Sequence, residues 1–367
     1  MGGAAGRSSA QFGGLSVHVR PVSLRPPIAM GEPRVKFAKA CLIALTLLAA
    51  PLNAHAQDGG PGYAHYMAGD RSLPTPGRRA PGLLLSGGGD WDVEAFRWFV
   101  ARAGHGHIVV LRASQKGELG EAFLKEIGGV ASVETFVFSE RKAAYDPRIL
   151  AALERADGVF IAGGDQSRYV RFWQATPLSR LIDRLARDRP IGGTSAGLAI
   201  MGWWGYGAFG DDGITSPEAL DNPMGPGVTV VDRFLYLPRM RRIFTDSHFM
   251  IRARMGRLIA FLANVRARGA KNIVGLGMDE RASLVVDGAG HARLMAPKGT
   301  YGWLVQPAGR AQRGVLGEKL DYAGIRITGI GADSRFDLNT LQVSHPAFSG
   351  VARVRAGVLT GVPAPLP

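Results

Sequence analysis

Short apolar stretches alternate with amphipathic stretches along the chain from residue 81 to residue 201. The apolar stretches predict buried strands, and the amphipathic ones, with apolar positions three and four residues apart, predict helices. Strands that alternate with helices form a parallel sheet with helices on both faces, so the predicted fold class is α/β. The predicted strands are 81–86, 107–111, 133–138, 158–162 and 190–193, and the predicted helices are 94–103, 118–127, 147–155, 166–176, 178–187 and 196–201.

The pattern changes after residue 201. Residues 202–227 are rich in Gly, Trp and Asp and predict little regular structure, whereas residues 228–237 look extended. Residues 248–268 place apolar side chains at helical spacing, and Gly269 ends the helix that they predict. Beyond residue 273 the pattern is that of short strands with a hairpin signal at Asp287-Gly288, so the C-terminal portion is predicted to be β-rich.

The first 80 residues differ in composition from the rest. Residues 1–29 are expected to precede the true start at Met30, and residues 30–56 have the basic start, the apolar run and the Ala54-x-Ala56 site of a signal peptide. The apolar run is shorter than the roughly 20 residues that a membrane span needs, although an uncleaved anchor is the alternative. We therefore expect a periplasmic or secreted protein, free of the membrane after cleavage, that begins at Gln57 with a loose leader over 57–80. A catalytic domain over 81–306 and a C-terminal extension over 307–367, β-rich or irregular, would follow.

The composition excludes several kinds of chemistry. The only cysteine, Cys41, lies in the predicted signal peptide, which leaves the mature chain without disulfides, a cysteine nucleophile or a thiolate metal site. The formal net charge is +14, but the basic side chains are spread along the chain without a basic run that interleaves aromatic residues. We therefore expect no nucleic-acid partner, while a positive field can still attract an anionic substrate.

Gly193-Thr-Ser195-Ala-Gly197 has the form of the G-x-S-x-G elbow of serine hydrolases. A serine on a tight strand-to-helix turn projects its hydroxyl away from the backbone. The backbone N–H of Ala196 and those of the Gly88-Gly89 loop could then stabilise an oxyanion. A Gly-rich loop that is structural or that binds phosphate remains the alternative.

A serine nucleophile needs a base and an acid that orients the base. Among the histidines, His248 is the best candidate, because it lies where an extended stretch gives way to the long helix. The acid is sought between the serine and this histidine, where Asp246 is one candidate and Glu218 another. The remaining candidates in this interval are Asp211, Asp212, Asp221 and Asp232.

Polar side chains near these residues could bind a substrate. Gln166 follows the Gly163-Gly164 turn at the same expected sheet edge as the serine, and its amide can both donate and accept hydrogen bonds. Three arginines follow the histidine, and guanidinium groups hold carboxylates through two-point contacts. A solvated helix face is the alternative for this cluster, which consists of Arg252, Arg254 and Arg257.

Taken together, five motifs in order resemble the cyanophycinase-like family of serine exopeptidases, relatives of aspartyl dipeptidase. These motifs are L-L-L-S-G-G-G (83–89), G-G-D-Q (163–166), G-G-T-S-A-G (192–197), D-S-H-F with R-x-R-x-G-R-L (246–258) and G-M-D-E-x-A (277–282). The resemblance implies a flavodoxin-like, class I glutamine amidotransferase-like fold and the chain order serine, acid, histidine. The chain departs from the family at Ser247, where many members have Gln, and over 202–227, which match poorly.

Carried onto this chain, the resemblance implies Ser195 as the nucleophile, His248 as the base and Glu218 as the acid. Gln166 and the three arginines would contact the substrate, and Asp246 would join them or replace Glu218 as the acid. The expected function is that of a secreted serine exopeptidase that hydrolyses β-aspartyl (isopeptide) bonds in cyanophycin or its fragments, without a metal or cofactor. Another serine amidase or esterase and a non-catalytic binding protein remain alternatives, and a homodimer is left open.

Overall fold

The computed structural model describes residues 59–114, 119–210, 213–309, 311 and 316–364. The segment 1–29 and the predicted signal peptide at 30–56 lie outside these ranges. Across the described part of the chain, no helix combines the length and the apolar character that crossing a membrane requires.

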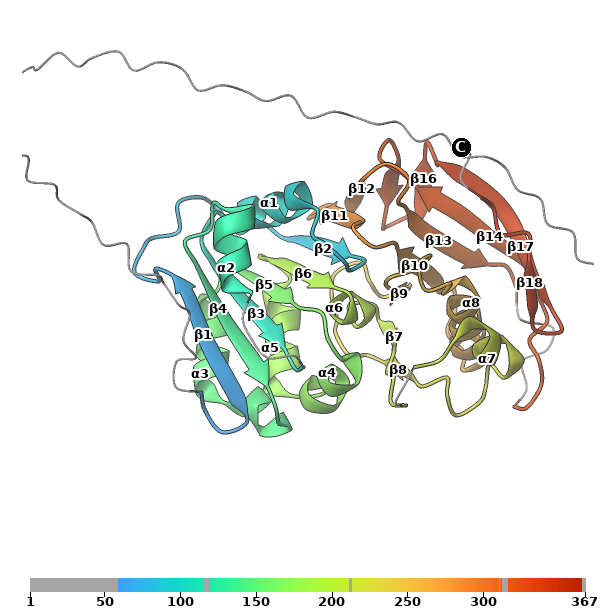
Figure 1. Cartoon of the computed structure of the whole chain (residues 1–367), viewed down its shortest axis with the longest axis horizontal. Coiled ribbons are helices and arrows are strands. Elements are labelled where there is room, and N and C mark those ends of the chain that lie inside the picture. Colours follow the sequence, from blue (N-terminus) through green and yellow to red (C-terminus); the bar gives the residue numbers. More distant parts are fainter. Residues whose placement is uncertain (1–58, 115–118, 211–212, 310, 312–315, 365–367) are drawn as a thin grey trace, which may run out of the picture. The chain divides into compact units, whose positions relative to one another are not determined.

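A sheet of ten described strands carries the N-terminal half of the fold (Figure 1). Its centre is parallel, and antiparallel strands extend it on both sides. In spatial order the strands are β1 (Tyr63–Gly69), β4 (Ser132–Phe138), β3 (His107–Arg112), β5 (Gly158–Ile161), β6 (Pro190–Thr194), β2 (Gly82–Ser86), β11 (Ser283–Asp287), β12 (His291–Met295), β15 (Arg335–Asp337) and β16 (Gln342–Ser344).

Helices cover both faces of this sheet because its central strands are apolar on both sides. Successive side chains of a strand point to opposite faces, so Leu83 and Leu85 pack with one set of helices and Leu84 with the other. The first set is α3 (Pro147–Arg155), α4 (Gln166–Trp173) and α5 (Pro177–Leu185), and the second is α1 (Val93–Arg102) with the π-helical turn η1 (Phe123–Ile127). Short helical segments complete this half, namely α2 (Gly120–Ala122), the 3₁₀ turn η2 (Arg141–Tyr145) and α6 (Ala196–Ala199).

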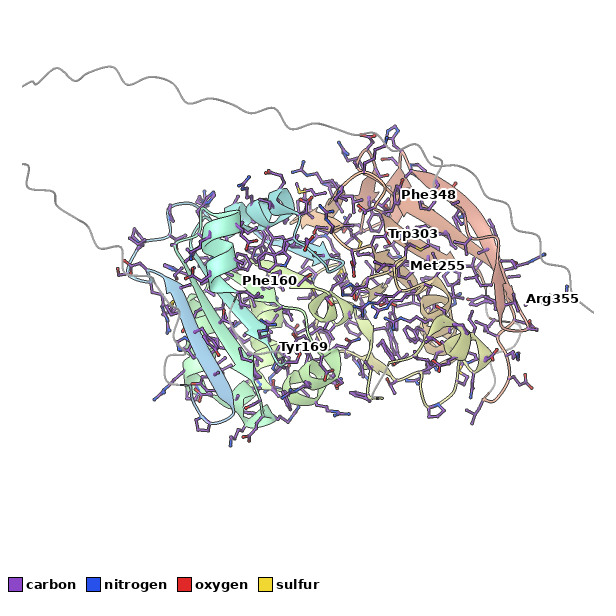
Figure 2. All side chains as sticks on the ribbon, viewed as in Figure 1. Phe160, Tyr169, Met255, Trp303, Phe348 and Arg355 are labelled. Atoms are coloured by element: carbon purple, nitrogen blue, oxygen red, sulfur yellow. The ribbon has the colours of Figure 1, made fainter. Side chains whose placement is uncertain are left out.

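A second sheet carries most of the C-terminal half. In spatial order its described strands are β18 (Val358–Thr360), β17 (Phe348–Arg355), β14 (Tyr322–Ile330), β13 (Gly302–Pro307), β10 (Val274–Met278), β9 (Ile243–Asp246), β7 (Trp204–Tyr206) and β8 (Val230–Asp232). The helices α7 (Ser216–Asp221) and α8 (Met255–Ala267) accompany it. Its core holds Met255 of α8 together with Trp303 and Phe348, whereas Phe160 and Tyr169 belong to the cores of the first sheet (Figure 2).

The predicted α/β class, with a parallel sheet, flanking helices and a β-rich C-terminal portion, is confirmed. Two local predictions are wrong. The leader over 57–80 is not loose throughout, because β1 pairs along its whole length with β4. The long helix begins at Met255 rather than at residue 248, since His248 and Ala253 adopt positive φ angles of 46° and 48° that interrupt a right-handed helix. The strands beyond residue 307 belong to both sheets, with β15 and β16 in the first and β14, β17 and β18 in the second.

Candidate active site

Ser195 occupies the turn between β6 and α6 in a backbone conformation that few L-residues adopt. Its φ and ψ angles are 52° and −115°, and its N–H donates to the Ser86 carbonyl at 3.2 Å. Its surroundings are crowded, since a Cβ on Gly197 would collide with the Ile161 carbonyl and one on Gly163 would lie 3.3 Å from Ser195 Cβ. The expected strand–turn–helix context of the elbow is therefore present, with backbone strain located at the serine itself.

His248 lies beside Ser195, although the two residues follow strands of different sheets. The chain leaves β9 at Asp246 and reaches His248, whose Nε2 lies 2.6 Å from Ser195 Oγ. The backbone N–H of His248 donates to the Gly87 carbonyl at 2.8 Å, which ties the histidine to the loop after β2. The serine and the histidine that the sequence offered as nucleophile and base therefore lie within hydrogen-bond distance of each other.

The carboxylate at the other imidazole nitrogen belongs to Glu280. Its Oε1 lies 2.5 Å from His248 Nδ1, so serine, histidine and glutamate form a continuous chain of hydrogen bonds. Glu280 follows β10, which runs parallel to the strand before His248. Its loop is held by Asp279, which accepts the Trp303 indole N–H at 3.0 Å, and by Arg281, whose N–H donates to the Gly88 carbonyl.

The structure does not bring Glu218 to the histidine, which corrects the prediction of this residue as the acid. Glu218 is exposed at the start of α7, where its carboxylate accepts from Thr215 N at 2.9 Å and from Thr215 Oγ1 at 2.7 Å. This reciprocal pattern is a helix N-terminal capping box, and it lowers the pKa of Glu218. The chain order is serine, histidine, acid, and not the expected serine, acid, histidine.

Glu280 lies outside the interval between Ser195 and His248 in which the acid was expected. The sequence nonetheless held a signal, since Glu280 ends the G-M-D-E stretch directly after a predicted strand. Carboxyl ends of parallel strands meet at one sheet edge, so a carboxylate after β10 comes close to a histidine after β9.

Burial sets the protonation state of the imidazole. His248 is only 8% exposed, and desolvation lowers its pKa from the ordinary value for histidine. The hydrogen bond to Glu280 works in the opposite direction, and the charges of Arg252 and Arg254 lower the pKa further. The imidazole is therefore neutral at neutral pH, which is the state that accepts a proton from a serine hydroxyl.

Asp246, the other acid that the sequence suggested, binds two arginines and does not touch His248. Its carboxylate is 2% exposed and accepts from Arg257 Nε at 2.8 Å, from Arg257 Nη2 at 2.6 Å and from Arg254 Nη1 at 3.3 Å. A carboxylate this enclosed does not reach a ligand, which corrects the prediction of Asp246 as a substrate contact. It holds the two guanidinium groups in place instead.

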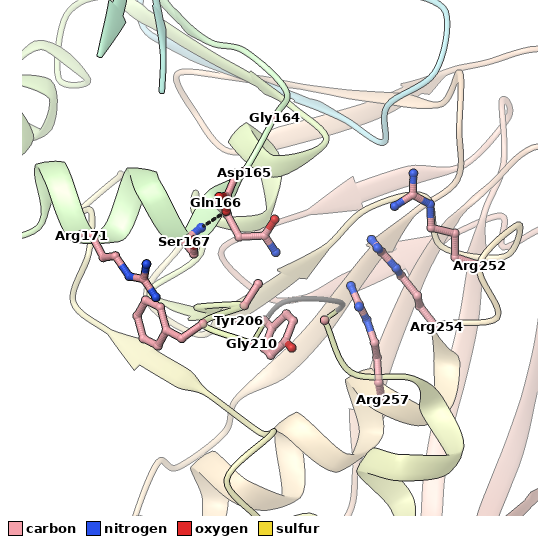
Figure 3. A pocket seen from close by; sticks show the side chains of 13 residues that line it. Gly164, Asp165, Gln166, Ser167, Arg171, Tyr206, Gly210, Arg252, Arg254 and Arg257 are labelled. Carbon is pink, nitrogen blue, oxygen red and sulfur yellow. Dashed lines mark hydrogen bonds between the residues drawn. The ribbon is translucent and has the colours of Figure 1, made fainter. Parts of the chain in front are cut away.

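A pocket of about 400 Å³ extends beside this site (Figure 3). Gln166, at the first turn of α4, points into it, and Arg252, Arg254 and Arg257 line the opposite wall. Burial lowers the pKa of Arg254 to about 10, while Asp246 raises it, so this guanidinium stays charged at neutral pH. The predicted binding residues other than Asp246 thus share one pocket that favours an anion.

The glycine loop after β2 lies directly against the histidine and the glutamate. Gly88 has a φ angle of 101°, and a Cβ on it would lie 2.6 Å from His248 Nε2, while one on Gly89 would lie 3.3 Å from Glu280 Oε2. No described residue accepts a hydrogen bond from the backbone N–H of Gly88 or Gly89. Among the described residues, no group of three or more His, Cys, Asp or Glu side chains is placed to hold a metal ion.

Comparisons with known proteins agree with the motifs. The chain is 30% identical over 234 residues to the cyanophycinase of Trichormus variabilis, covering 61% of this chain and 73% of that protein. It is 27% identical over 235 residues to the cyanophycinase of Synechococcus elongatus, covering 62% and 67%. A solved peptidase from an acI-B1 Actinobacterium is 14% identical with a TM-score of 0.46, covering 71% of this chain and 98% of that one. No protein-family model matches the chain.

Proposed function

The chain belongs to the cyanophycinase family and is a hydrolase of the peptidase class, and we propose that it is a serine peptidase for β-aspartyl (isopeptide) linkages. The observation that carries the proposal is the hydrogen-bonded series Ser195, His248 and Glu280. The nucleophile, base and orienting acid of a serine hydrolase have this arrangement.

In the proposed reaction, Ser195 Oγ attacks the substrate carbonyl while its proton passes to His248 Nε2. Glu280 accepts the Nδ1–H, which orients the ring and stabilises the imidazolium that forms. The imidazolium then protonates the leaving amine as the carbon–nitrogen bond breaks, and an acyl-enzyme remains. Water attacks this ester with His248 again as the base, which releases the acid and restores the serine.

The oxyanion that forms during both steps needs hydrogen-bond donors. Backbone N–H groups of Gly88, Gly89 and Ala196 flank the serine and the imidazole, and they are the donors that we propose. Fixed backbone donors need no reorganisation during the reaction, which is what makes such groups effective. The stabilisation of the oxyanion by these donors would lower the reaction barrier in addition to the proton transfers through His248.

The substrate assignment rests on the pocket and on the relatives' name. Arg252, Arg254 and Arg257 would hold the free carboxylate of an aspartyl residue, and Gln166 would contact the adjoining amide. Because both relatives are cyanophycinases, we propose cyanophycin or its fragments as the first substrates to examine. The basic pocket is consistent with an aspartyl substrate that carries a free carboxylate.

The test is hydrolysis of cyanophycin and of isoaspartyl dipeptides by the protein beginning at Gln57, compared with Ser195→Ala. We expect turnover by the first and none above background by the second, together with labelling of Ser195 by a serine-directed fluorophosphonate. Retention of the wild-type rate by Ser195→Ala would refute the mechanism. Turnover of simple esters or amides without β-aspartyl peptides would refute the substrate class alone.

The proposed location is the periplasm or the medium, on the basis of the signal peptide read at residues 30–56. Expression of the chain from Met30, followed by cell fractionation and N-terminal sequencing, tests it. The expected product begins at Gln57. A homodimer stays a prediction that the mass in solution checks.

A further inference from the structure

A fourth arginine lines the pocket on the wall opposite the three that follow the histidine (Figure 3). Arg171 extends from α4, and its guanidinium lies over the ring of Phe209 at 5.4 Å from the ring centroid. Stacking on a ring face restricts where a guanidinium points and leaves its N–H edge available. The contact with the Phe209 ring therefore restricts the orientation of the exposed Arg171 guanidinium.

Arg171 and Phe209 also line a second depression of about 560 Å³. Both residues line both hollows, so the second depression adjoins the active-site pocket at this pair. The exposed Tyr236 also lines this depression, and its backbone N–H donates to Asp183 at 2.6 Å. Two further lining residues are joined by a hydrogen bond from the Gln174 amide nitrogen to the Asp232 carbonyl at 3.0 Å.

The other charges of the second depression have partners. Arg141 donates to the carbonyls of Arg171 and Gln174, each at 2.8 Å, and Arg233 pairs with Asp232 at 3.0 Å. The guanidinium of Arg171 has no carboxylate or carbonyl partner among the described residues. An unneutralised guanidinium at the junction of two hollows favours an anionic group of the ligand.

We propose that Arg171 and Phe209 form a distal subsite for the continuation of the substrate chain, in which Arg171 binds a carboxylate one or two residues from the attacked bond. This inference rests on the proposed peptidase function. It assigns the enzyme a preference for longer acidic chains over isolated dipeptides. Phe209 contributes the apolar surface against which the chain lies, and the depression toward Tyr236 receives the remainder.

The experiment compares two isoaspartyl peptides of equal length that share the same β-aspartyl bond. One carries Asp at the two positions beyond the dipeptide, and the other carries Asn. For the wild-type protein we expect kcat/KM to favour the acidic peptide about tenfold, the effect of one charge-assisted hydrogen bond. Arg171→Ala should abolish this preference, so that kcat/KM becomes the same for the two peptides.

Arg168→Ala is the matched control, because Arg168 lies on the same helix with its guanidinium over Phe172 at 5.5 Å and lines neither hollow. Arg168→Ala should keep the preference for the acidic peptide.

Equal kcat/KM values of the wild type for the two peptides, or a preference that survives Arg171→Ala, would overturn the subsite. Binding of both peptides to Ser195→Ala is measured in parallel. If no peptide is hydrolysed, the proposed function fails, and the binding preference still decides for or against the subsite.

Discussion

Glu280 accepts a hydrogen bond from His248 at 2.5 Å, although the two residues are 32 positions apart and follow two neighbouring parallel strands. The carboxylate that pairs with the histidine therefore comes after it in the sequence. The pairing also predicts which of two glutamates matters for turnover.

Glu280→Gln should lower kcat by about 10³-fold or more, because an amide cannot stabilise the imidazolium and can favour the wrong tautomer. Glu218→Gln is the matched control and should stay within about twofold of the wild type, since Gln can also complete a capping box. Steady-state kinetics with an isoaspartyl peptide measures both variants. A large loss in Glu218→Gln with little loss in Glu280→Gln would reverse the assignment.

The acidic limb of the pH–rate profile should lie below pH 6.5. His248 must be neutral to accept the serine proton, so activity is lost as the pH falls through its folded pKa, and burial lowers that pKa. The charge of Arg252 also lowers it, so Arg252→Ala should shift the limb of kcat/KM toward higher pH. A limb above pH 7, or a shift toward lower pH in Arg252→Ala, contradicts this account.

Gly88→Ala should reduce kcat by about 100-fold or more, because a methyl group at this position overlaps the imidazole that transfers the proton. Gly128→Ala controls for backbone strain, since Gly128 also has a positive φ angle, 73°, but a Cβ there would meet nothing within 4 Å. We expect Gly128→Ala to keep its activity and to lose about 1 kcal/mol of unfolding free energy. Equal activity losses in the two variants would assign the effect to strain rather than to the imidazole.

Asp246→Asn should destabilise the fold by about 3 kcal/mol, because it leaves the buried guanidinium of Arg257 without its carboxylate. It should also raise KM, since two arginines of the pocket lose their common support. Glu154→Gln removes a similarly short ion pair with Arg184 that is exposed on both sides, and it should change stability by no more than about 0.5 kcal/mol. Urea unfolding of both variants and kinetics of Asp246→Asn measure these effects.

The elements that the sequence predicted best are determined by residues that are close together in the chain. Helix α3 spans Pro147–Arg155 as predicted, because Asp146 caps it and a proline occupies its first turn. Strand β1 was missed because its residues are only partly buried, so its pairing with β4 leaves a weak apolar pattern. Pairing across more than 60 residues is a tertiary property that a local pattern does not contain.

The residues of the candidate site also differ in whether a local sequence pattern predicts them. Ser195 could be predicted because a strand, a tight glycine-flanked turn and a helix are adjacent in the chain. His248 could be predicted because it closely follows an extended stretch, which is β9 in the structure. The acid could not be selected by position alone, since the order of the strands in the second sheet decides which carboxylate comes within reach, and that order places β10 beside β9.

The second sheet has a consequence for how the protein loses activity. Ser195 follows a strand of the first sheet, and His248 follows a strand of the second. Glu280 lies where the chain passes from β10 of the second sheet to β11 of the first. Local unfolding that reaches β6 or β9 would therefore separate the hydroxyl from its base without unfolding of the rest of the chain. On mild heating, turnover should consequently be lost at a lower temperature than bulk secondary structure. Activity would then report partial unfolding that measurements of secondary structure do not detect.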